Sequence, residues 1–119
     1  MLTVYTYTVC DRCRAATKWL REHGIPFEER AIRETPPTLA ELAVMLAAYT
    51  GEMRKLFNTS GRDYRDQQLG LKLPALSVPA ALTLLAGNGN LVKRPFVVGP
   101  RVAIVGFDAA VWSARILAL

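Results

Sequence analysis

The sequence is poor in side chains that bind metals, and it has no long apolar run. Its 119 residues include two cysteines and one histidine, whereas a structural zinc site needs four ligands. His23 lies at the far end of the helix predicted after Cys10, roughly 15 Å from Cys13 by helical rise. The longest predominantly apolar run, residues 75–86, is too short to span a bilayer and contains Pro79. These absences exclude a membrane-spanning helix, and they leave structural zinc only in a site shared between chains.

Length and composition predict an ordinary globular protein. A chain of 119 residues with 51% hydrophobic residues can bury a core without disulfides, and we expect residues 1–119 to form a single domain. Met1 leads directly into a β-rich segment, without a basic stretch followed by an apolar one, so no secretory signal is expected. We therefore expect a cytoplasmic protein, in a reducing compartment where paired cysteines are more often catalytic or sensing than structural.

The net charge is positive but not concentrated in one segment. Fifteen Lys and Arg residues against ten Asp and Glu residues give a formal net charge of +5. A basic balance suits nucleic acids, acidic partners or small anions. The basic residues are spread along the chain, with no dense run and no interleaved aromatic residues, so direct nucleic-acid binding is not expected.

The two cysteines lie at the junction between a predicted strand and a predicted helix. Residues 2–7 are rich in β-branched and aromatic side chains, which favours a strand. A helix is predicted to begin at about Asp11 and to end at Gly24. Cys10 then lies at the helix N-terminus, where unpaired backbone N–H groups and the helix dipole favour a negative charge. Cys13 lies one turn further on, within reach for a disulfide, which is the arrangement of a redox site.

Two buried and inert cysteines are the alternative interpretation, since a free cysteine often packs as a small hydrophobic residue. Asp11, Arg12 and Arg14 surround the pair and argue against burial of the whole segment. Redox or nucleophilic chemistry is therefore the interpretation that the residues favour.

The rest of the sequence predicts a mixed α/β order with a long helical block in the middle. Residues 27–32 predict a second strand, parallel to the first across a right-handed βαβ crossover. Residues 96–98 and 102–105 predict a hairpin, and Asp108 is placed to cap a last helix. Between the second strand and the hairpin, capping residues and helix breakers predict four short helices. The first begins after Thr38, the second covers residues 52–57, the third covers residues 64–69 and the fourth begins after Ser77.

A C-x-x-C pair at the first strand–helix junction of such a chain is typical of the thioredoxin-like fold. In that fold a proline, often cis, precedes the third strand and lies against the thiols. Pro95 stands immediately before the strand predicted to begin at Phe96, although a proline at a strand start is common by itself. The two features together predict an α/β thioredoxin-like fold, β-α-β … β-β-α, with a helical insertion over about residues 38–90.

Four segments in this order resemble the ArsC/Spx branch of the thioredoxin-like proteins, and together they span nearly the whole chain. They are residues 5–27, which contain the C-x-x-C pair, and residues 38–42, 56–61 and 90–98. The first and the last are fairly specific at this separation. The resemblance implies the thioredoxin-like fold and a thiol chemistry centred on the two cysteines.

The resemblance also implies roles for individual residues. Cys10 matches the nucleophilic cysteine of arsenate reductases and the first redox cysteine of Spx regulators. Cys13 matches the second Spx cysteine, at a position where glutaredoxin-coupled arsenate reductases usually carry serine. Arg94 matches the arginine that faces the anion or thiolate beside the cis-proline, a role that suits a guanidinium. The substrate-binding candidates that complete this set are Arg14, Pro95 and Arg101.

Arsenate reductases of this branch use two further arginines around the anion. One of them has no counterpart in register, because residues 56–58 contain no arginine. The arginines near that segment but out of register are Arg54, Arg62 and Arg65. The other family arginine falls near the turn between the third and fourth strands, where Arg101 is the candidate.

Two functions follow from the resemblance. The first is a thiol-disulfide oxidoreductase in which Cys10 attacks a small oxyanion or a thiol or disulfide substrate, and Cys13 resolves the product as an intramolecular disulfide. No bound cofactor is expected, and thioredoxin or glutathione with glutaredoxin is the expected reductant. The second is an Spx-like redox-sensing transcriptional regulator that binds the RNA polymerase α-subunit, with Gly51 as the candidate contact. Neither function implies direct contact with nucleic acid or a membrane.

Overall fold

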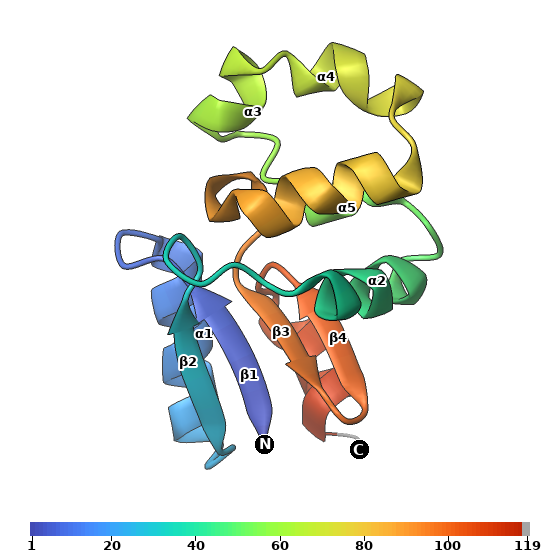
Figure 1. Cartoon of the computed structure of the whole chain (residues 1–119). Coiled ribbons are helices and arrows are strands. Elements are labelled where there is room, and N and C mark those ends of the chain that lie inside the picture. Colours follow the sequence, from blue (N-terminus) through green and yellow to red (C-terminus); the bar gives the residue numbers. More distant parts are fainter. Residues whose placement is uncertain (118–119) are drawn as a thin grey trace.

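Four strands form one sheet in the computed structural model, which describes residues 1–117 (Figure 1). The strands are β1 (Leu2–Thr6), β2 (Phe27–Ala31), β3 (Phe96–Gly99) and β4 (Val102–Val105). Their order across the sheet is β2-β1-β3-β4. β2 is parallel to β1, β3 is antiparallel to β1, and β4 is antiparallel to β3. The predicted βαβ unit and the predicted hairpin are both confirmed.

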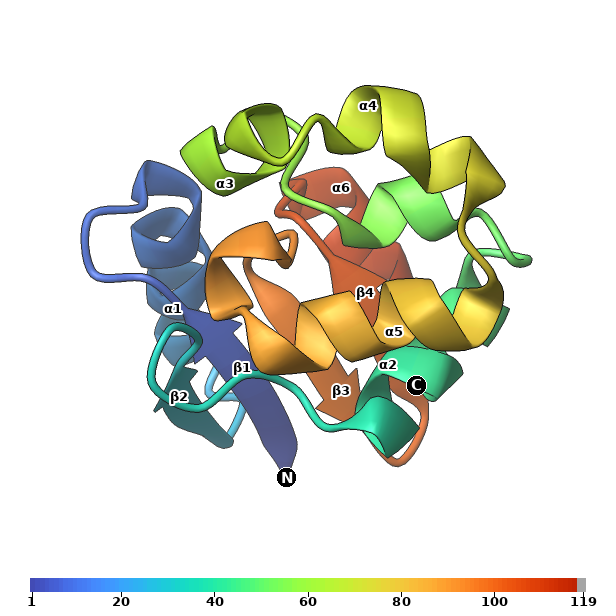
Figure 2. The same ribbon diagram turned by 45° about the horizontal axis from the view of Figure 1, so that its top comes forward.

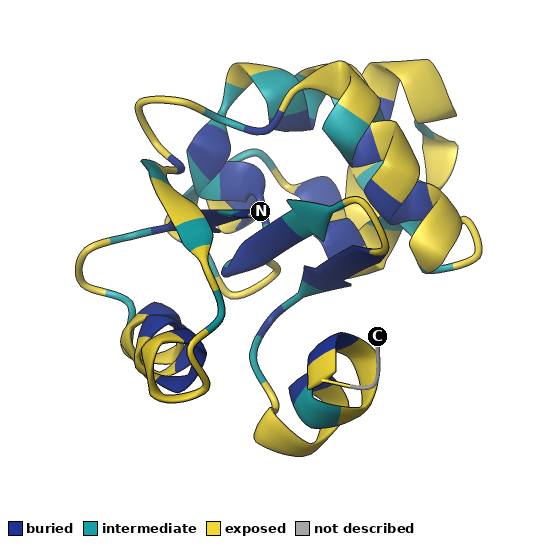
Figure 3. Ribbon diagram, turned by 90° about the horizontal axis from the view of Figure 1, so that it is seen from below, coloured by how far each residue is buried: buried dark blue, intermediate teal, exposed yellow. Residues whose placement is uncertain are grey.

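Two helices cover one face of this sheet (Figure 3). α1 (Asp11–Glu22) connects β1 to β2, and the chain leaves it through Gly24 at a φ of 65°, a conformation that favours glycine. α6 (Ala109–Trp112) begins as predicted at Asp108, whose Oδ1 accepts a 3.1 Å hydrogen bond from the Val111 N–H. A π-helical turn over Ser113–Leu117 continues α6.

The predicted helical insertion joins β2 to β3 and covers the other face. α2 (Leu39–Ala48) and α5 (Val78–Gly87) pack against the sheet, while α3 (Arg62–Asp66) and α4 (Leu69–Lys72) lie beyond α5 (Figures 1 and 2). Three short 3-10 turns connect these helices, at Met53–Leu56, Leu73–Ala75 and Gly89–Leu91. Within residues 1–117 none of the helices has the length and apolar composition needed to cross a membrane.

The single helix predicted over residues 64–69 is wrong, because the chain breaks between α3 and α4. Gln68 has a φ of 54°, in the left-handed region, and a right-handed helix cannot continue through such a residue. Glutamine has no particular preference for this conformation, so no local pattern in the sequence indicates the break.

Two tyrosine hydroxyls tie α2 to the sheet. Thr38 and Glu41 form the predicted capping box at the start of α2, and Glu41 Oε1 also accepts a 2.7 Å hydrogen bond from the Tyr5 hydroxyl of β1. At the other end of α2, the Tyr49 hydroxyl accepts a 3.0 Å hydrogen bond from the Val105 N–H of β4. The insertion is therefore fixed to both an inner and an outer strand.

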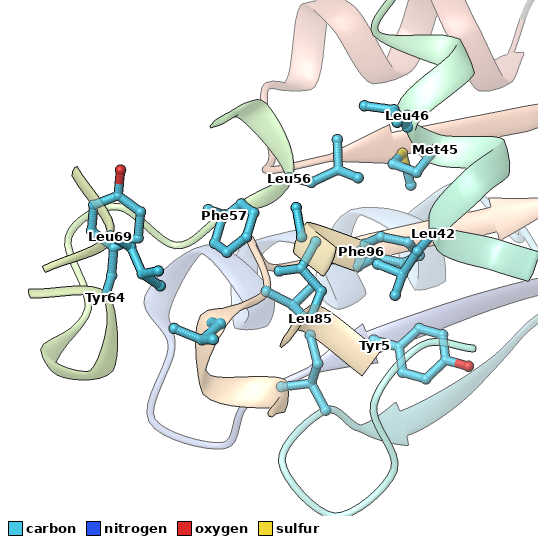
Figure 4. Packing of buried hydrophobic residues seen from close by; sticks show 14 of the residues in the cluster. Tyr5, Leu42, Met45, Leu46, Leu56, Phe57, Tyr64, Leu69, Leu85 and Phe96 are labelled. Atoms are coloured by element: carbon cyan, nitrogen blue, oxygen red, sulfur yellow. The ribbon is translucent and has the colours of Figure 1, made fainter. Parts of the chain in front are cut away.

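The core lies on both faces of the sheet, because neighbouring residues of a strand point to opposite sides. Val4 and Val97 pack toward α1 and α6, whereas Tyr5 and Phe96 pack toward the insertion. Figure 4 shows the second cluster, in which Phe96 meets side chains from α2 and α5. Those side chains include Leu42, Met45 and Leu85, all fully buried.

Candidate thiol site at the carboxyl end of the sheet

Three segments far apart in the sequence meet at one end of the sheet (Figures 1 and 2). β1 and β2 are parallel, so the loops that follow them lie side by side. The turn at Gly89–Leu91 packs against the loop after β2, because a Cβ on Gly89 would lie 1.8 Å from the Ile32 carbonyl oxygen. This turn leads into Arg94, which is thereby brought to the same end as the two cysteines.

Cys10 is the N-cap residue of α1, as the sequence predicted. Its Sγ accepts a 3.2 Å hydrogen bond from the Cys13 N–H, and its own N–H donates to the Tyr7 carbonyl oxygen at 3.1 Å. The side chain is half-buried, so it remains open to small molecules. The backbone N–H of the first helical turn thus fixes the position of this sulfur at the start of α1.

Cys13 has a different environment, since its side chain is only 2% exposed. Burial, followed by the hydrogen bond to the Cys10 side chain, raises the pKa of its thiol to about 12. A hydrogen bond with the Tyr7 backbone and the positive charge of Arg94 act in the opposite direction on the same pKa. At neutral pH the two sulfurs are therefore unequal: Cys13 holds its proton, and Cys10 is the accessible one.

The raised pKa of Cys13 predicts a loss of stability in alkaline solution. In the unfolded chain this thiol ionises near its ordinary pKa of 9.0, and in the folded protein only near about 12. Between these values the folded state binds more protons than the unfolded chain, so the free energy of unfolding falls as the pH rises. We expect the stability difference between wild type and Cys13→Ala to shrink from neutral pH to about pH 11, measured by urea unfolding. Parallel curves for the two proteins would contradict this assignment.

Arg14 lies beside the thiol loop, but its guanidinium is engaged there. Its Nη1 donates to the Thr8 carbonyl oxygen at 3.0 Å, and its Nη2 forms an ion pair with Asp11. These contacts fix the loop that carries Cys10. Substrate binding by Arg14 stays a prediction.

Arg94 lies against the ring of Tyr7, with its guanidinium carbon 4.8 Å from the ring centroid. Its Nη1 is buried and has no hydrogen-bond partner within the part of the chain that the structure describes. Such an unsatisfied buried donor is uncommon. Pro95 follows as a buried residue, and the Arg94–Pro95 peptide is cis. The geometry thus brings Arg94 and Pro95 to the end of the sheet where the cysteines lie.

Arg33 is a neighbour of the site that the sequence-based reasoning missed. Its Nη1 donates to the Tyr7 hydroxyl at 3.0 Å, and its guanidinium carbon lies 5.2 Å from the Tyr7 ring centroid. The strand pairing explains this position: Thr6 pairs with Ala31, so Tyr7 and Arg33, which follow the two strands, start from the same end of the sheet. That parallel register, predicted by the βαβ pattern, is the signal that was available in the sequence.

Arg101 is not brought to the thiols, which corrects the expectation drawn from the resemblance. It is exposed in the turn between β3 and β4. β3 runs antiparallel to β1, with Val98 beside Thr3, so this turn lies near the first residues of β1. Cys10 follows the last residues of β1, at the opposite end of the sheet (Figure 1).

Comparisons with known proteins agree with this arrangement. The model of the ArsC family matches residues 5–115. The uncharacterized protein YusI of Bacillus subtilis is 42% identical over 106 residues, which cover 89% of this chain and 90% of YusI. The global transcriptional regulator Spx of Enterococcus faecalis is 34% identical over 108 residues, covering 91% of this chain and 80% of the regulator. The solved structure of a possible arsenate reductase from Streptococcus mutans matches with a TM-score of 0.85 and 35% identity, covering 92% of each chain.

The span matched by the family model runs from β1 into the last helical turn. It therefore includes both cysteines, the helical insertion and the turn that carries Arg94. The resemblance inferred from four short segments is confirmed over almost the whole length, toward Spx regulators as well as toward arsenate-reductase-like structures. This chain belongs to the ArsC family and has a thioredoxin-like fold.

Proposed function

We propose that this protein is a thiol-disulfide oxidoreductase in which Cys10 is the nucleophile and Cys13 is the resolving thiol. The observation that carries the proposal is the inequality of the two sulfurs. Cys10 is accessible and accepts a backbone N–H, while Cys13 is buried, protonated and hydrogen-bonded to Cys10. One thiol placed to attack and a second held beside it is the arrangement that disulfide exchange requires.

With a disulfide R–S–S–R as substrate, the Cys10 thiolate attacks one sulfur and the S–S bond breaks. The leaving thiolate takes a proton and departs as RSH, and Cys10 remains in a mixed disulfide. Cys13 then gives up its proton and attacks the Cys10 sulfur, which releases the second RSH. The substrate gains two electrons, the cysteine pair loses two, and thioredoxin or glutathione with glutaredoxin reduces the pair again.

Arsenate is the second substrate that suits the same sulfurs. Attack of Cys10 on arsenic joins sulfur to the oxyanion, and one oxygen takes up protons and leaves as water. Attack of Cys13 on the Cys10 sulfur then releases arsenite, so arsenic gains the two electrons that the cysteines lose. The cycle needs no bound cofactor, and the likeness to the Streptococcus mutans protein supports including arsenate.

The test is NADPH oxidation with arsenate or glutathione disulfide as substrate. Arsenate is coupled separately to thioredoxin with its reductase and to glutathione with glutaredoxin and glutathione reductase. Glutathione disulfide is coupled to thioredoxin with its reductase alone, because glutathione reductase consumes this disulfide directly, and the rate without the protein is subtracted in every assay. We expect turnover with at least one substrate and formation of a Cys10–Cys13 disulfide, detected as a loss of two mass units. A lack of turnover in every combination would refute the oxidoreductase proposal.

A redox-sensing regulator is the second candidate, and the 34% identity with Spx favours it. Cys10 and Cys13 would then form a disulfide that changes the affinity of this protein for the RNA polymerase α-subunit. A reversible disulfide without turnover, together with redox-dependent retention on immobilised α-subunit, would decide for this candidate.

A further inference from the structure

Two guanidinium groups lie over the same aromatic ring at the mouth of the thiol site. The guanidinium carbons of Arg33 and Arg94 are 5.2 Å and 4.8 Å from the centroid of Tyr7. Tyr7 is also linked to the thiol site, because its carbonyl oxygen accepts the Cys10 N–H. The two positive charges are therefore positioned by the same residue that holds the Cys10 backbone.

Neither of these arginines is held in close contact by a carboxylate of the described residues. Within residues 1–117 no ion pair involves Arg33 or Arg94. Arg33 uses one hydrogen bond, to the Tyr7 hydroxyl, out of the five donors of a guanidinium, and Arg94 Nη1 has no partner. A guanidinium with unused donors favours an anion as its partner, and both of these guanidiniums lie against the ring of Tyr7.

The carboxylates around this end of the sheet do not remove that preference. Asp63 accepts hydrogen bonds from the side-chain amides of Asn88 and Asn90, at 2.9 Å and 3.3 Å, and these bonds, followed by the charges of Arg33 and Arg62, lower the pKa of its carboxyl. A depression of about 510 Å³ beside Tyr7 is lined by Glu29 and Glu34, and Glu29 accepts a 2.6 Å hydrogen bond from Thr6. Arg33, which contacts Tyr7 and precedes Glu34 in the sequence, is a basic residue beside these acids.

We propose that Arg33 is a specificity-determining residue that, together with Arg94, binds an anionic group of the substrate beside Cys10. This inference rests on the proposed function, because it names the substrate class of the same site. The anionic group is either the oxyanion that is attacked or a carboxylate carried by a thiol or disulfide substrate. When Arg33 is removed, the negative charges of Glu29 and Glu34 are no longer offset by it, and the preference of the site shifts toward cationic substrates.

The first measurement does not depend on turnover. Cys10 is alkylated with iodoacetate, which is an anion, and with iodoacetamide, which is neutral, and the ratio of the two rate constants cancels the ionisation of the thiol. We expect Arg33→Ala to lower this ratio about threefold to tenfold, the order of the Coulomb factor for removing one unit charge from a partly solvated site. Arg33→Lys retains most of the ratio because it keeps the charge. Added salt reduces the difference between wild type and Arg33→Ala.

Arg115→Ala is the matched control, since it removes the same charge from an exposed residue of the C-terminal helical turn. Its ratio should equal that of wild type. If Arg33→Ala changes the ratio no more than Arg115→Ala does, the proposal is overturned. A lowered ratio in Arg33→Ala supports it, even where no substrate is turned over and the oxidoreductase proposal fails.

The second measurement identifies the source of the anion when turnover is found. Wild type and Arg33→Ala are compared on arsenate, on glutathione disulfide and on cystamine, a cationic disulfide. A loss in kcat/KM confined to arsenate assigns Arg33 to the oxyanion, and a loss confined to glutathione disulfide assigns it to a carboxylate. Equal changes with the anionic and cationic disulfides, with no change for arsenate, would overturn the proposal.

Discussion

Replacing Cys10 by serine is expected to abolish reduction of both arsenate and glutathione disulfide. A serine hydroxyl stays protonated at the helix N-terminus and is a poor nucleophile toward sulfur, so no covalent intermediate forms. The loss should be at least about 10³-fold in kcat, as when other enzymes lose their nucleophile. Serine caps helices well, so α1 is expected to keep its N-terminus and the protein its stability. Urea unfolding of the variant checks this last point.

Cys13→Ser is the matched variant, and its expected behaviour differs. Cys10 still attacks, but the resolving thiol is absent, so a mixed disulfide between Cys10 and the substrate should accumulate and be visible by mass. Turnover supported by thioredoxin should be lost, whereas glutathione can still attack the mixed disulfide. Unchanged turnover in Cys13→Ser with thioredoxin would show that Cys13 does not resolve the intermediate. Activity retained in Cys10→Ser would remove Cys10 from the mechanism.

Gly89→Ala is expected to cause the largest loss of stability of any alanine substitution at a glycine in this protein. A Cβ at this position would lie 1.8 Å from the Ile32 carbonyl oxygen and 2.6 Å from its carbon, both backbone atoms. The turn at Gly89–Leu91 must then move away from the loop after β2. Overpacking of this kind costs about 3 kcal/mol of unfolding free energy, equivalent to a lowering of Tm by roughly 10 °C or more. Thermal unfolding followed by circular dichroism measures the shift.

Gly87→Ala provides the control, because nothing lies within 4 Å of a Cβ there and the residue ends α5. This substitution should be neutral or stabilise the protein by up to about 1 kcal/mol, since alanine favours a helix over glycine. Gly89→Ala should also weaken the anion preference of Cys10, because the displaced turn leads directly to Arg94. A stability of Gly89→Ala equal to that of Gly87→Ala would contradict the close approach of the two backbones.

The elements and caps that depend on neighbouring residues were predictable from the sequence. Thr38 and Glu41 form the capping box, and Cys10 caps the helix whose start was predicted next to it. These features follow from interactions within three or four residues, which a sequence pattern displays directly. The cis peptide bond before β3 was predictable only through the resemblance to a family.

The positions of the arginines depend on strand direction. This dependence explains why Arg33 was missed as a neighbour of the thiol site and why Arg101 was wrongly expected there. Arg33 follows β2, and the parallel pairing carries it to Tyr7, although 26 positions separate the two in sequence. Arg101 follows β3, and the antiparallel pairing carries it to the far end of the sheet. Matching residues to a family pattern one by one does not include this geometry. Applying the predicted strand directions to every arginine would have separated the two.

The hydrogen bond from Val105 to Tyr49 has a consequence for association between molecules. β4 is an outer strand of the sheet, and the free N–H and C=O groups of an outer strand are a template onto which another chain can add by main-chain pairing. The Tyr49 hydroxyl occupies one of those N–H groups, and β4 itself is only four residues long. The opposite outer strand, β2, carries Glu28, Glu29 and Arg30, whose charges oppose the pairing of two copies through this edge. Both margins of the sheet are thereby protected against aggregation.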